Sequence, residues 1–247
     1  FNCRRIERFV HERVIFVGDS AHVVSPFGAR GGNGGIHDVD NLCWKLARVV
    51  RGESDESLLE SYNSERVHGA DENISNSSWT SRFMSPERGV EMAFRNAALS
   101  LAVDTPFARR VVNAGRLSVP CRLTDSTLNS ADDTGLDVPQ QIGMVALDAP
   151  LTAPDGSRSW LMRQLGGGFA CLVTGDANLD DAAVPKGVEL VRIGAGGFAD
   201  AEGKVAERYG SAVYLVRPDQ HVAARWTAPD AADIAAAMAC CTARVAA

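Results

Sequence analysis

Apolar residues near the start of the chain follow two different spacings. The run Arg13–Val17 is short, apolar and rich in branched side chains, and it stops at Gly18, which predicts a strand buried on both faces. After a glycine-rich loop, apolar residues recur every three or four positions, which predicts an amphipathic helix that starts near Gly34 and is ended by Gly52. The order of strand, loop and helix is typical of the ligand-binding edge of an α/β fold.

The same reading predicts two further helices before the middle of the chain. One spans residues 57–68, and the other spans residues 87–103, where Pro86 and Pro106 set its limits. Residues 117–141 are rich in Ser, Thr, Asp, Asn and Pro and are interpreted as a connector.

Beyond the connector, strands and helices alternate, as in a small α/β domain with its own core. Strands are predicted over residues 169–173, 188–193, 212–216 and 221–226. Helices are predicted over residues 159–165, 201–209 and 231–245. We therefore expect three parts: residues 1–120, a connector at 121–140 and a C-terminal domain at 141–247.

Composition and charge narrow the function classes. With 247 residues, 45% of them hydrophobic and 23% charged, the chain is suited to two globular domains. Its net charge of −6 argues against a general nucleic-acid surface, and no apolar run is long enough to span a membrane. The six cysteines form no Cys-x-x-Cys pair and no signal peptide is recognisable, so we expect reduced thiols in a cytoplasmic protein. The five histidines lack metal-ligand spacing, and no metal is expected.

Candidate chemistry gathers between the first strand and the first helix. Asp19 would bring a carboxylate to the sheet edge, where it can accept hydrogen bonds from sugar or ribityl hydroxyls, and Gly18 permits close approach. The loop 26–35 holds five glycines, so its amides can face a ligand. The helix N-terminus that follows favours negative charge. Phosphate and the anionic edge of a reduced flavin are both suitable ligands for this helix N-terminus.

These motifs resemble the second FAD motif of flavin-dependent aromatic hydroxylases, the single-component monooxygenases of the phenol and hydroxybenzoate hydroxylase type. The resemblance is carried by Arg13–His22, Pro26–Asn33, Asp38, Asn41–Ala47, Leu58–Tyr62 and Glu65–Arg66. In the tail, Leu215–Asp219 and Val222–Arg225 resemble the thioredoxin-like domain of the larger members. The implied fold is α/β: the C-terminal part of an FAD-binding domain (strand, Gly-rich loop, helices), followed by a thioredoxin-like α/β domain.

The resemblance also implies roles for single residues. Asp19 would bind the FAD ribityl chain, with Gly18 beside it. Pro26 would lie near the flavin ring, and its carbonyl, bordering the reaction pocket, is the candidate catalytic group. The implied cofactor-binding residues are Gly18, Asp19, Pro26, Gly28, Gly31, Gly32 and Asn33. The last three would offer backbone amides to the pyrimidine edge of the flavin.

The implied activity is that of an FAD-dependent monooxygenase. NADPH or NADH would reduce FAD, O2 would be consumed, and a phenolic or polycyclic aromatic substrate would be hydroxylated. The Gly-x-Gly-x-x-Gly element that opens such enzymes does not precede Gly18. We therefore expect a C-terminal portion that does not retain FAD alone. We expect no nucleic-acid or membrane partner, and association between copies through the apolar faces of residues 13–17 and of the helix after Gly34.

Two other functions stay open at this stage. The chain could be a non-catalytic association module, or part of a flavin enzyme of other chemistry, such as a dehydrogenase or halogenase. Gly194–Ala199 has the glycine pattern of a dinucleotide loop, but Ala replaces the third glycine and the next helix is short. We interpret that segment as an ordinary loop.

Several neighbours of the motif receive structural interpretations. His22 is expected to bond a nearby carbonyl, because no proton-transfer partner is adjacent. Asp38 and Asn41 are expected to fix the helix start and its neighbours, and Trp44 to lie in the core. Arg30 is either solvated or placed at the flavin entrance.

Overall fold

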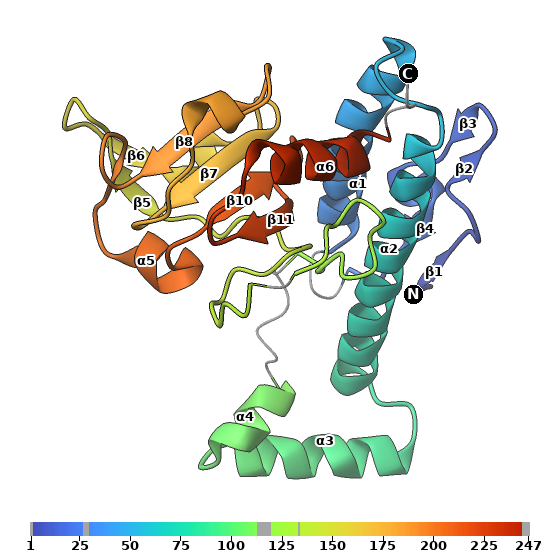
Figure 1. The fold of residues 1–247 in the computed structure, drawn as a ribbon. Helices are drawn as coiled ribbons and strands as arrows, with labels where there is room; N and C mark the ends of the chain where they lie inside the picture. The colour runs from blue at the N-terminus through green and yellow to red at the C-terminus, as the bar shows by residue number, and fades with distance from the viewer. Residues whose placement is uncertain (1, 27–29, 113–119, 133, 244–247) are drawn as a thin grey trace. The chain divides into compact units, whose positions relative to one another are not determined.

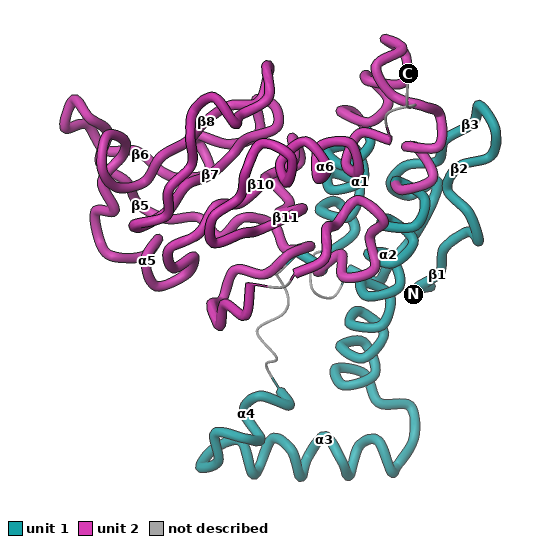
Figure 2. The backbone as a smooth tube through the Cα atoms, in the orientation of Figure 1, with its two compact units in different colours: residues 1–42, 62–121 teal, residues 43–61, 122–247 magenta. Residues whose placement is uncertain are grey.

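The chain forms two compact units, coloured separately in Figure 2. The computed structural model describes residues 2–26, 30–112, 120–132 and 134–243. Unit 1 contains Phe1–Leu42 and Tyr62–Cys121, and unit 2 contains Cys43–Ser61 and Arg122–Ala247. Helix α1 (Arg30–Val50) is therefore divided between the units after Leu42, and helix α2 (Leu58–Met84) after Ser61.

Unit 1 combines short strands with long helices (Figure 1). Strand β1 (Arg4–Arg5) pairs antiparallel with β4 (His22–Val23), and β2 (Val10–His11) pairs antiparallel with β3 (Val14–Ile15). A 3-10 turn, η1 (Gly18–Ser20), lies between β3 and β4. Helices α3 (Gly89–Ala102) and α4 (Pro106–Val112) follow α2.

The prediction of a doubly buried strand at residues 13–17 is wrong in this structure. Only Val14 and Ile15 are extended, and they belong to a two-stranded ribbon with β2. Val14 is 56% exposed. A two-stranded ribbon has no neighbouring strands or layers of its own to cover both faces. The apolar composition of residues 13–17 predicts a strand, but it does not show which other elements cover the faces of that strand.

The helices of unit 1 were predicted in the right places but with different limits. The helix expected from Gly34 begins four residues earlier, at Arg30, and ends at Val50. The helix expected over 57–68 continues to Met84, and the one expected over 87–103 corresponds to α3. The extension of α2 is rich in Asn and Ser, so it has no apolar periodicity from which a helix could be predicted.

Unit 2 is built on a four-stranded sheet. Its strands, in the order β11-β10-β7-β8, are Val222–Trp226, Val213–Val216, Ala170–Thr174 and Glu189–Ile193. Strands β7 and β8 are parallel, and the other neighbours are antiparallel. A separate three-stranded sheet contains β6 (Arg158–Trp160), β5 (Pro150–Thr152) and β9 (Ala199–Asp200).

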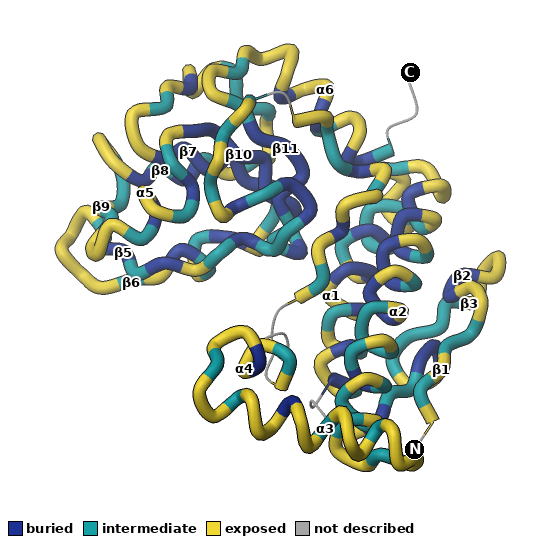
Figure 3. Tube along the Cα trace, turned by 90° about the horizontal axis from the view of Figure 1, so that it is seen from below, coloured by how far each residue is buried: buried dark blue, intermediate teal, exposed yellow. Residues whose placement is uncertain are grey.

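Both faces of the four-stranded sheet are covered, because its strands are apolar at successive positions. On β7, Leu172 belongs to one core cluster and Cys171 to the other, and both are fully buried. The first cluster includes Tyr209 of α5 (Lys204–Tyr209), and the second includes Ile234 of α6 (Ala231–Thr242). Figure 3 shows the buried colour concentrated on these strands.

The predicted elements of unit 2 are largely confirmed. All four strands lie where the sequence indicated them, with the antiparallel pair β10 and β11 around a tight turn. The helix predicted over 159–165 is wrong: that segment finishes β6 and continues as the 3-10 turn η2 (Leu161–Gln164). A second 3-10 turn, η3, covers Asp181–Ala183. Between β8 and β9, the Gly194 N–H donates to the Phe198 carbonyl and the Phe198 N–H donates to the Arg192 carbonyl, within a turn that leads into a strand. This agrees with the loop interpretation of that segment.

The turn between β10 and β11 holds a buried ion pair. Nη2 of Arg217 lies 2.5 Å from Oδ2 of Asp219, and both side chains are almost fully buried. Burial opposes the charge on Asp219, but the charge of Arg217 and contact with His221 outweigh it, so the pKa of Asp219 lies well below its usual value. The Arg217 guanidinium also lies 5.5 Å from the Trp44 ring centroid, and Trp44 packs edge-on against Phe169. Trp44 thus lies at the core, as predicted.

Candidate functional site

The Gly18 turn packs directly against the first turns of α1. Gly18 has φ of +58°, a left-handed conformation that glycine adopts without steric cost. A Cβ added at Gly35 would lie 3.4 Å from the Gly18 Cα, so the two backbones are already in close approach. The turn that carries Asp19 is therefore fixed next to the N-terminal part of a long helix.

A buried carboxylate on α1 holds this turn in place. Oδ2 of Asp38 accepts hydrogen bonds from the Gly18 N–H at 2.9 Å and from Nε2 of His22 at 2.7 Å. Oδ1 of Asp38 accepts a third bond, at 2.7 Å, from Nε of Arg66 on α2. Asp38 itself is 0% exposed. One side chain thus joins the Gly18 turn, strand β4 and helices α1 and α2.

The surroundings of Asp38 keep it ionised. Burial disfavours the charged form, but the hydrogen bond from His22, the charge and hydrogen bond of Arg66 and the Gly18 N–H outweigh that cost. The pKa of Asp38 consequently lies below its ordinary value of 3.8. An ionised carboxylate only accepts hydrogen bonds, so the proton in the contact with His22 resides on Nε2.

Helix α2 secures the rest of the segment at other points along its length. The hydroxyl of Tyr62 donates to the Phe16 carbonyl at 2.8 Å, just before Gly18, and burial raises the pKa of this phenol. Further along α2, Asn73 Oδ1 accepts a 2.7 Å bond from Nη1 of Arg30, the first residue of α1. Arg30 is only 6% exposed, so the alternative in which it is solvated is wrong.

The residue before Pro26 is held by serines of α2. The hydroxyl of Ser25 lies 2.6 Å from that of Ser77 and 2.7 Å from that of Ser81. Ser77 also donates to the Ser25 carbonyl at 3.2 Å. Ser25 is buried, whereas Pro26 is exposed. Pro26 therefore stands at the surface on a fixed base.

The predicted cofactor residues lie on the two sides of this arrangement. Asp19 is exposed, and its carboxylate makes no hydrogen bond or ion pair within the described part of the chain. Gly31, Gly32 and Asn33 lie in the first turn of α1. Gly28 lies outside the described residues. The structure thus brings the acceptor side chain and the helix N-terminus together through the Gly18–Gly35 contact.

The space at the helix start suits a planar, electron-rich ligand edge. A Cβ added at Gly32 would meet nothing within 4 Å, and one at Gly31 would meet only Val24, at 3.7 Å. Backbone N–H groups in the first turn of a helix have no acceptor within the helix, and the helix dipole adds partial positive charge there. The open first turn of α1 and the exposed carboxylate of Asp19 thus offer groups of the kind that an FAD molecule needs.

Two structural interpretations from the sequence need correction. His22 donates to the carboxylate of Asp38 rather than to a carbonyl. Asp38 is sixteen residues further along the sequence, but the fold brings it into contact with His22. Asp38 was expected to fix the helix start and its neighbours; it lies about two turns inside α1 and fixes Gly18 and His22. Asn41 lies on the same helix and donates to Oε2 of Glu65 at 2.7 Å.

Helix α2 supplies most of the site residues that sequence reasoning missed. Tyr62, Arg66, Asn73 and Ser77 were not given roles, although Glu65 and Arg66 were part of the recognised motif. Glu65 and Arg66 are adjacent charged residues that are only 2% and 3% exposed. Local spacing does not reveal burial of this kind, because the partners lie on a different helix.

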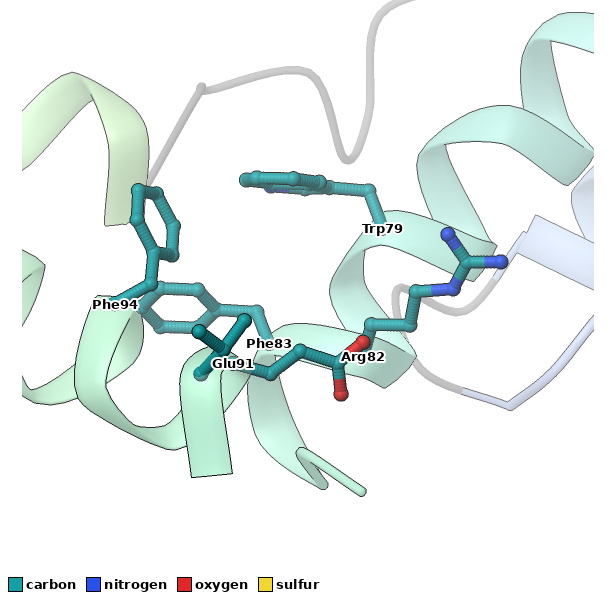
Figure 4. Close-up of a pocket in the computed structure, with 6 residues that line it drawn as sticks. Trp79, Arg82, Phe83, Glu91 and Phe94 are labelled. Atoms are coloured by element: carbon teal, nitrogen blue, oxygen red, sulfur yellow. The ribbon is translucent and has the colours of Figure 1, made fainter. Parts of the chain in front are cut away.

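A separate open pocket lies in unit 1 where α2 ends and α3 begins (Figure 4). It has a volume of about 380 Å³ and is lined by the rings of Trp79, Phe83 and Phe94 together with Arg82 and Glu91. Trp79 and Phe94 are about half exposed and meet edge to face at 6.1 Å. The lining would suit an apolar group.

Comparison with known proteins finds relatives for both parts of the chain. Residues 1–77 match the family model described as FAD binding domain, and residues 140–244 match the model described as aromatic-ring hydroxylase, C-terminal. A 3-(3-hydroxy-phenyl)propionate/3-hydroxycinnamic acid hydroxylase of Burkholderia cenocepacia (strain HI2424) is 29% identical over 268 residues, which cover 98% of this chain and 48% of the relative. The tetracenomycin B2 monooxygenase-dioxygenase of Streptomyces olivaceus is 48% identical over 68 residues, 28% of this chain and 12% of the relative.

Solved structures with a similar fold belong to the same class of enzyme. The crystal structure of aklavinone-11 hydroxylase in a ternary complex with FAD and aklavinone matches with a TM-score of 0.73 and 25% identity, covering 98% of this chain and 46% of that one. These are flavoprotein monooxygenases. The relatives of this chain are thus FAD-dependent aromatic-ring hydroxylases, and the chain spans about half the length of the curated relatives it matches.

None of the helices among the described residues is long and apolar enough to cross a membrane.

The ionised state of Asp38 leads to a pH-dependent prediction. Asp38→Asn should lower the free energy of unfolding at neutral pH by roughly 3–5 kcal/mol, the usual loss when a buried ion pair loses one partner. Because the folded-state pKa of Asp38 is depressed, its stabilisation is present above the unfolded-state pKa of about 3.9 and is lost as pH falls through the folded-state value. Urea denaturation of both proteins across pH measures this difference, which should shrink in acid.

Asp104→Asn is the matched control, because Asp104 is an exposed carboxylate of the same unit. It should change the free energy of unfolding by less than about 0.5 kcal/mol. A difference between parent and Asp38→Asn that stays constant into strong acid would contradict the assigned charge.

Proposed function

We propose that this chain supplies the ribityl and ring-edge half of an FAD site in an NAD(P)H-using monooxygenase that hydroxylates a phenolic or polycyclic aromatic compound. The observation that carries the proposal is the Gly18 turn, fixed by Asp38 beside the glycine-rich N-terminus of α1. The relative named for 3-(3-hydroxy-phenyl)propionate and the solved complex with FAD and aklavinone support the substrate class and the cofactor.

Each candidate residue has a distinct task in this proposal. The exposed carboxylate of Asp19 accepts hydrogen bonds from ribityl hydroxyls. Gly18 has no side chain, so the ribityl chain can approach the backbone closely there. Gly31, Gly32 and Asn33 present first-turn amides to the pyrimidine edge, where the helix dipole stabilises negative charge. When bound, FAD supplies electron transfer from NADPH or NADH and activation of O2.

Pro26 and its support define the edge of the proposed reaction pocket. The Pro26 carbonyl would border the substrate, and the Ser25, Ser77 and Ser81 hydroxyls hold the preceding residue. Gly28 would complete the loop. In this proposal the serines of the rigid helix α2 hold Pro26 in place, and Pro26 helps to position the substrate.

The remaining parts of the proposal concern the rest of the chain. We propose residues 1–120 as the FAD-binding part, 121–140 as connector and 141–247 as a thioredoxin-like domain. The central sheet of unit 2, with helices α5 and α6 contributing to the cores on its two faces, supports the last assignment. Six free cysteines among the described residues support a cytoplasmic location.

Association between copies is a further part of the proposal. Val14, Ile36 and Val39 are 56%, 65% and 48% exposed on the elements where apolar faces were expected. Helices α3 and α4 are drawn mostly in the exposed colour in Figure 3. These helices and the turn between them carry a longer exposed apolar series: Val90, Met92, Phe94, Leu99, Leu101, Val103, Phe107 and Val112. Apolar surface of this extent is typical of an interaction face.

The 247-residue chain purified alone should carry no stoichiometric FAD. The reason is that its relatives contain about as many residues again with no counterpart in this chain, and the Gly-x-Gly-x-x-Gly pyrophosphate element is not found before Gly18. Visible flavin absorbance and protein concentration give the ratio directly. One flavin for each purified chain would contradict this expectation.

Asp19→Ala should weaken FAD binding in the complete flavoprotein that carries these residues. Loss of a charge-assisted hydrogen bond costs about 1.5–3 kcal/mol, or roughly a 10- to 100-fold rise in Kd. Flavin fluorescence titration measures this Kd, and Asp104→Ala, a change at another exposed carboxylate, is the control. An unchanged Kd for Asp19→Ala would remove Asp19 from the site.

The isolated chain should self-associate at micromolar concentration. Size-exclusion chromatography with light scattering should give a mass above the 26.3 kDa of one chain. Val14→Ser and Ile36→Ser should shift the mass toward one chain, because they remove exposed apolar area. A single-chain mass at all concentrations would contradict the proposal.

A further inference from the structure

We infer that Arg66 of α2 is a positioning residue for FAD binding, acting through Asp38 on the Gly18 turn. This inference rests on the proposed FAD site and adds to it a residue outside the flavin-facing segment. Arg66 touches none of the residues proposed to meet the cofactor among the bonds described above. Its link to them is the carboxylate of Asp38, which it meets at 2.7 Å.

The charge on Asp38 depends on Arg66. Asp38 is 0% exposed and Arg66 is 3% exposed, so neither group is stabilised by water. A buried carboxylate without a compensating cation takes up a proton or moves toward solvent. Arg66 is the guanidinium in contact with Asp38, so it keeps the carboxylate ionised and in place.

The ionised carboxylate of Asp38 fixes the Gly18 turn. Oδ2 of Asp38 accepts from both the Gly18 N–H and His22 Nε2, and a protonated or displaced carboxyl cannot serve both donors with the same geometry. Gly18 immediately precedes Asp19, and the left-handed φ of Gly18 sets the direction in which the chain leaves the turn. Loss of Arg66 therefore moves the proposed ribityl acceptor without touching it.

Arg66 and His22, two partners of Asp38, each lie close to a glycine. A Cβ added at Gly69, one turn further along α2, would lie 2.8 Å from Nη1 of Arg66. A Cβ added at Gly34 would lie 2.9 Å from Cε1 of His22. A methyl group at either glycine would therefore displace a partner of Asp38.

The same two helices offer a matched control. Asn41 and Glu65 join α1 to α2 by a buried 2.7 Å hydrogen bond, and each lies close in sequence to the Asp38–Arg66 pair. This bond does not include the Gly18 turn. Asn41→Ala should therefore weaken the packing of the helices but leave the position of Asp19 unchanged.

The experiment uses the complete flavoprotein and measures two quantities for each variant: the Kd for FAD and the free energy of unfolding of the apoprotein. Arg66→Lys keeps the charge but loses the guanidinium geometry. Gly69→Ala displaces the guanidinium while improving intrinsic helix propensity. Both should raise the Kd for FAD by about tenfold, since a charged hydrogen-bonding group is put out of place. Asn41→Ala should lower stability and change the Kd by less than about twofold.

A double variant distinguishes action through Asp38 from general damage. If Arg66 acts through Asp38, Arg66→Lys combined with Asp38→Asn should raise the Kd no further than Asp38→Asn alone, because effects of one network do not add. Full additivity, or an Asn41→Ala effect on Kd as large as that of Arg66→Lys, would overturn the inference while the FAD site stands. Failure of the parent flavoprotein to bind FAD would overturn the proposed function, and the inference with it.

Discussion

The carboxylate of Asp38 is removed from water and surrounded by donors from three parts of the chain. The Gly18 turn, strand β4 and helix α2 each supply one hydrogen bond to it. Burial of a charge is costly unless such partners are complete, so the four elements are stable only in this arrangement. The exposed Asp19 turn, the glycine-rich start of α1 and the serine-supported base of Pro26 all take their positions from elements that meet at this carboxylate or along α2.

This constraint explains why a polar helix is central to unit 1. Helix α2 has little apolar periodicity beyond its first turns, yet Tyr62, Asn73 and Ser77 each bind a different point of the segment that precedes or begins α1. Arg66 binds Asp38 inside α1. Hydrogen bonds have direction, so a row of them fixes a backbone path more closely than apolar contact does. A cofactor site that depends on backbone amides requires such a fixed path. Unit 2 relies instead on two apolar cores on the faces of one sheet.

The same difference decides how much of the molecule was predictable from its sequence. The strands of unit 2 follow apolar runs bounded by turns, so Phe169–Val173 and the pair around Arg217–Gln220 were located correctly. The flavin segment was recognised from Gly18, Asp19 and the glycines after Pro26, which are specific residue types in one stretch. The partner of His22, the burial of Arg30 and the part played by Arg66 were not predictable in this way. Each depends on a side chain from another element, and local spacing contains no information about which elements meet.

The most direct test of this view is amide hydrogen exchange at Gly18 in the chain itself, followed by NMR. Gly18 lies in a partly exposed surface turn, and its N–H is bonded only to a side chain, Asp38, rather than to the backbone of a helix or sheet. If the buried carboxylate fixes the turn, the Gly18 amide should exchange slowly, with a protection close to that of the amides inside α1. Exchange at the rate of an unprotected turn amide would contradict the central role assigned to Asp38.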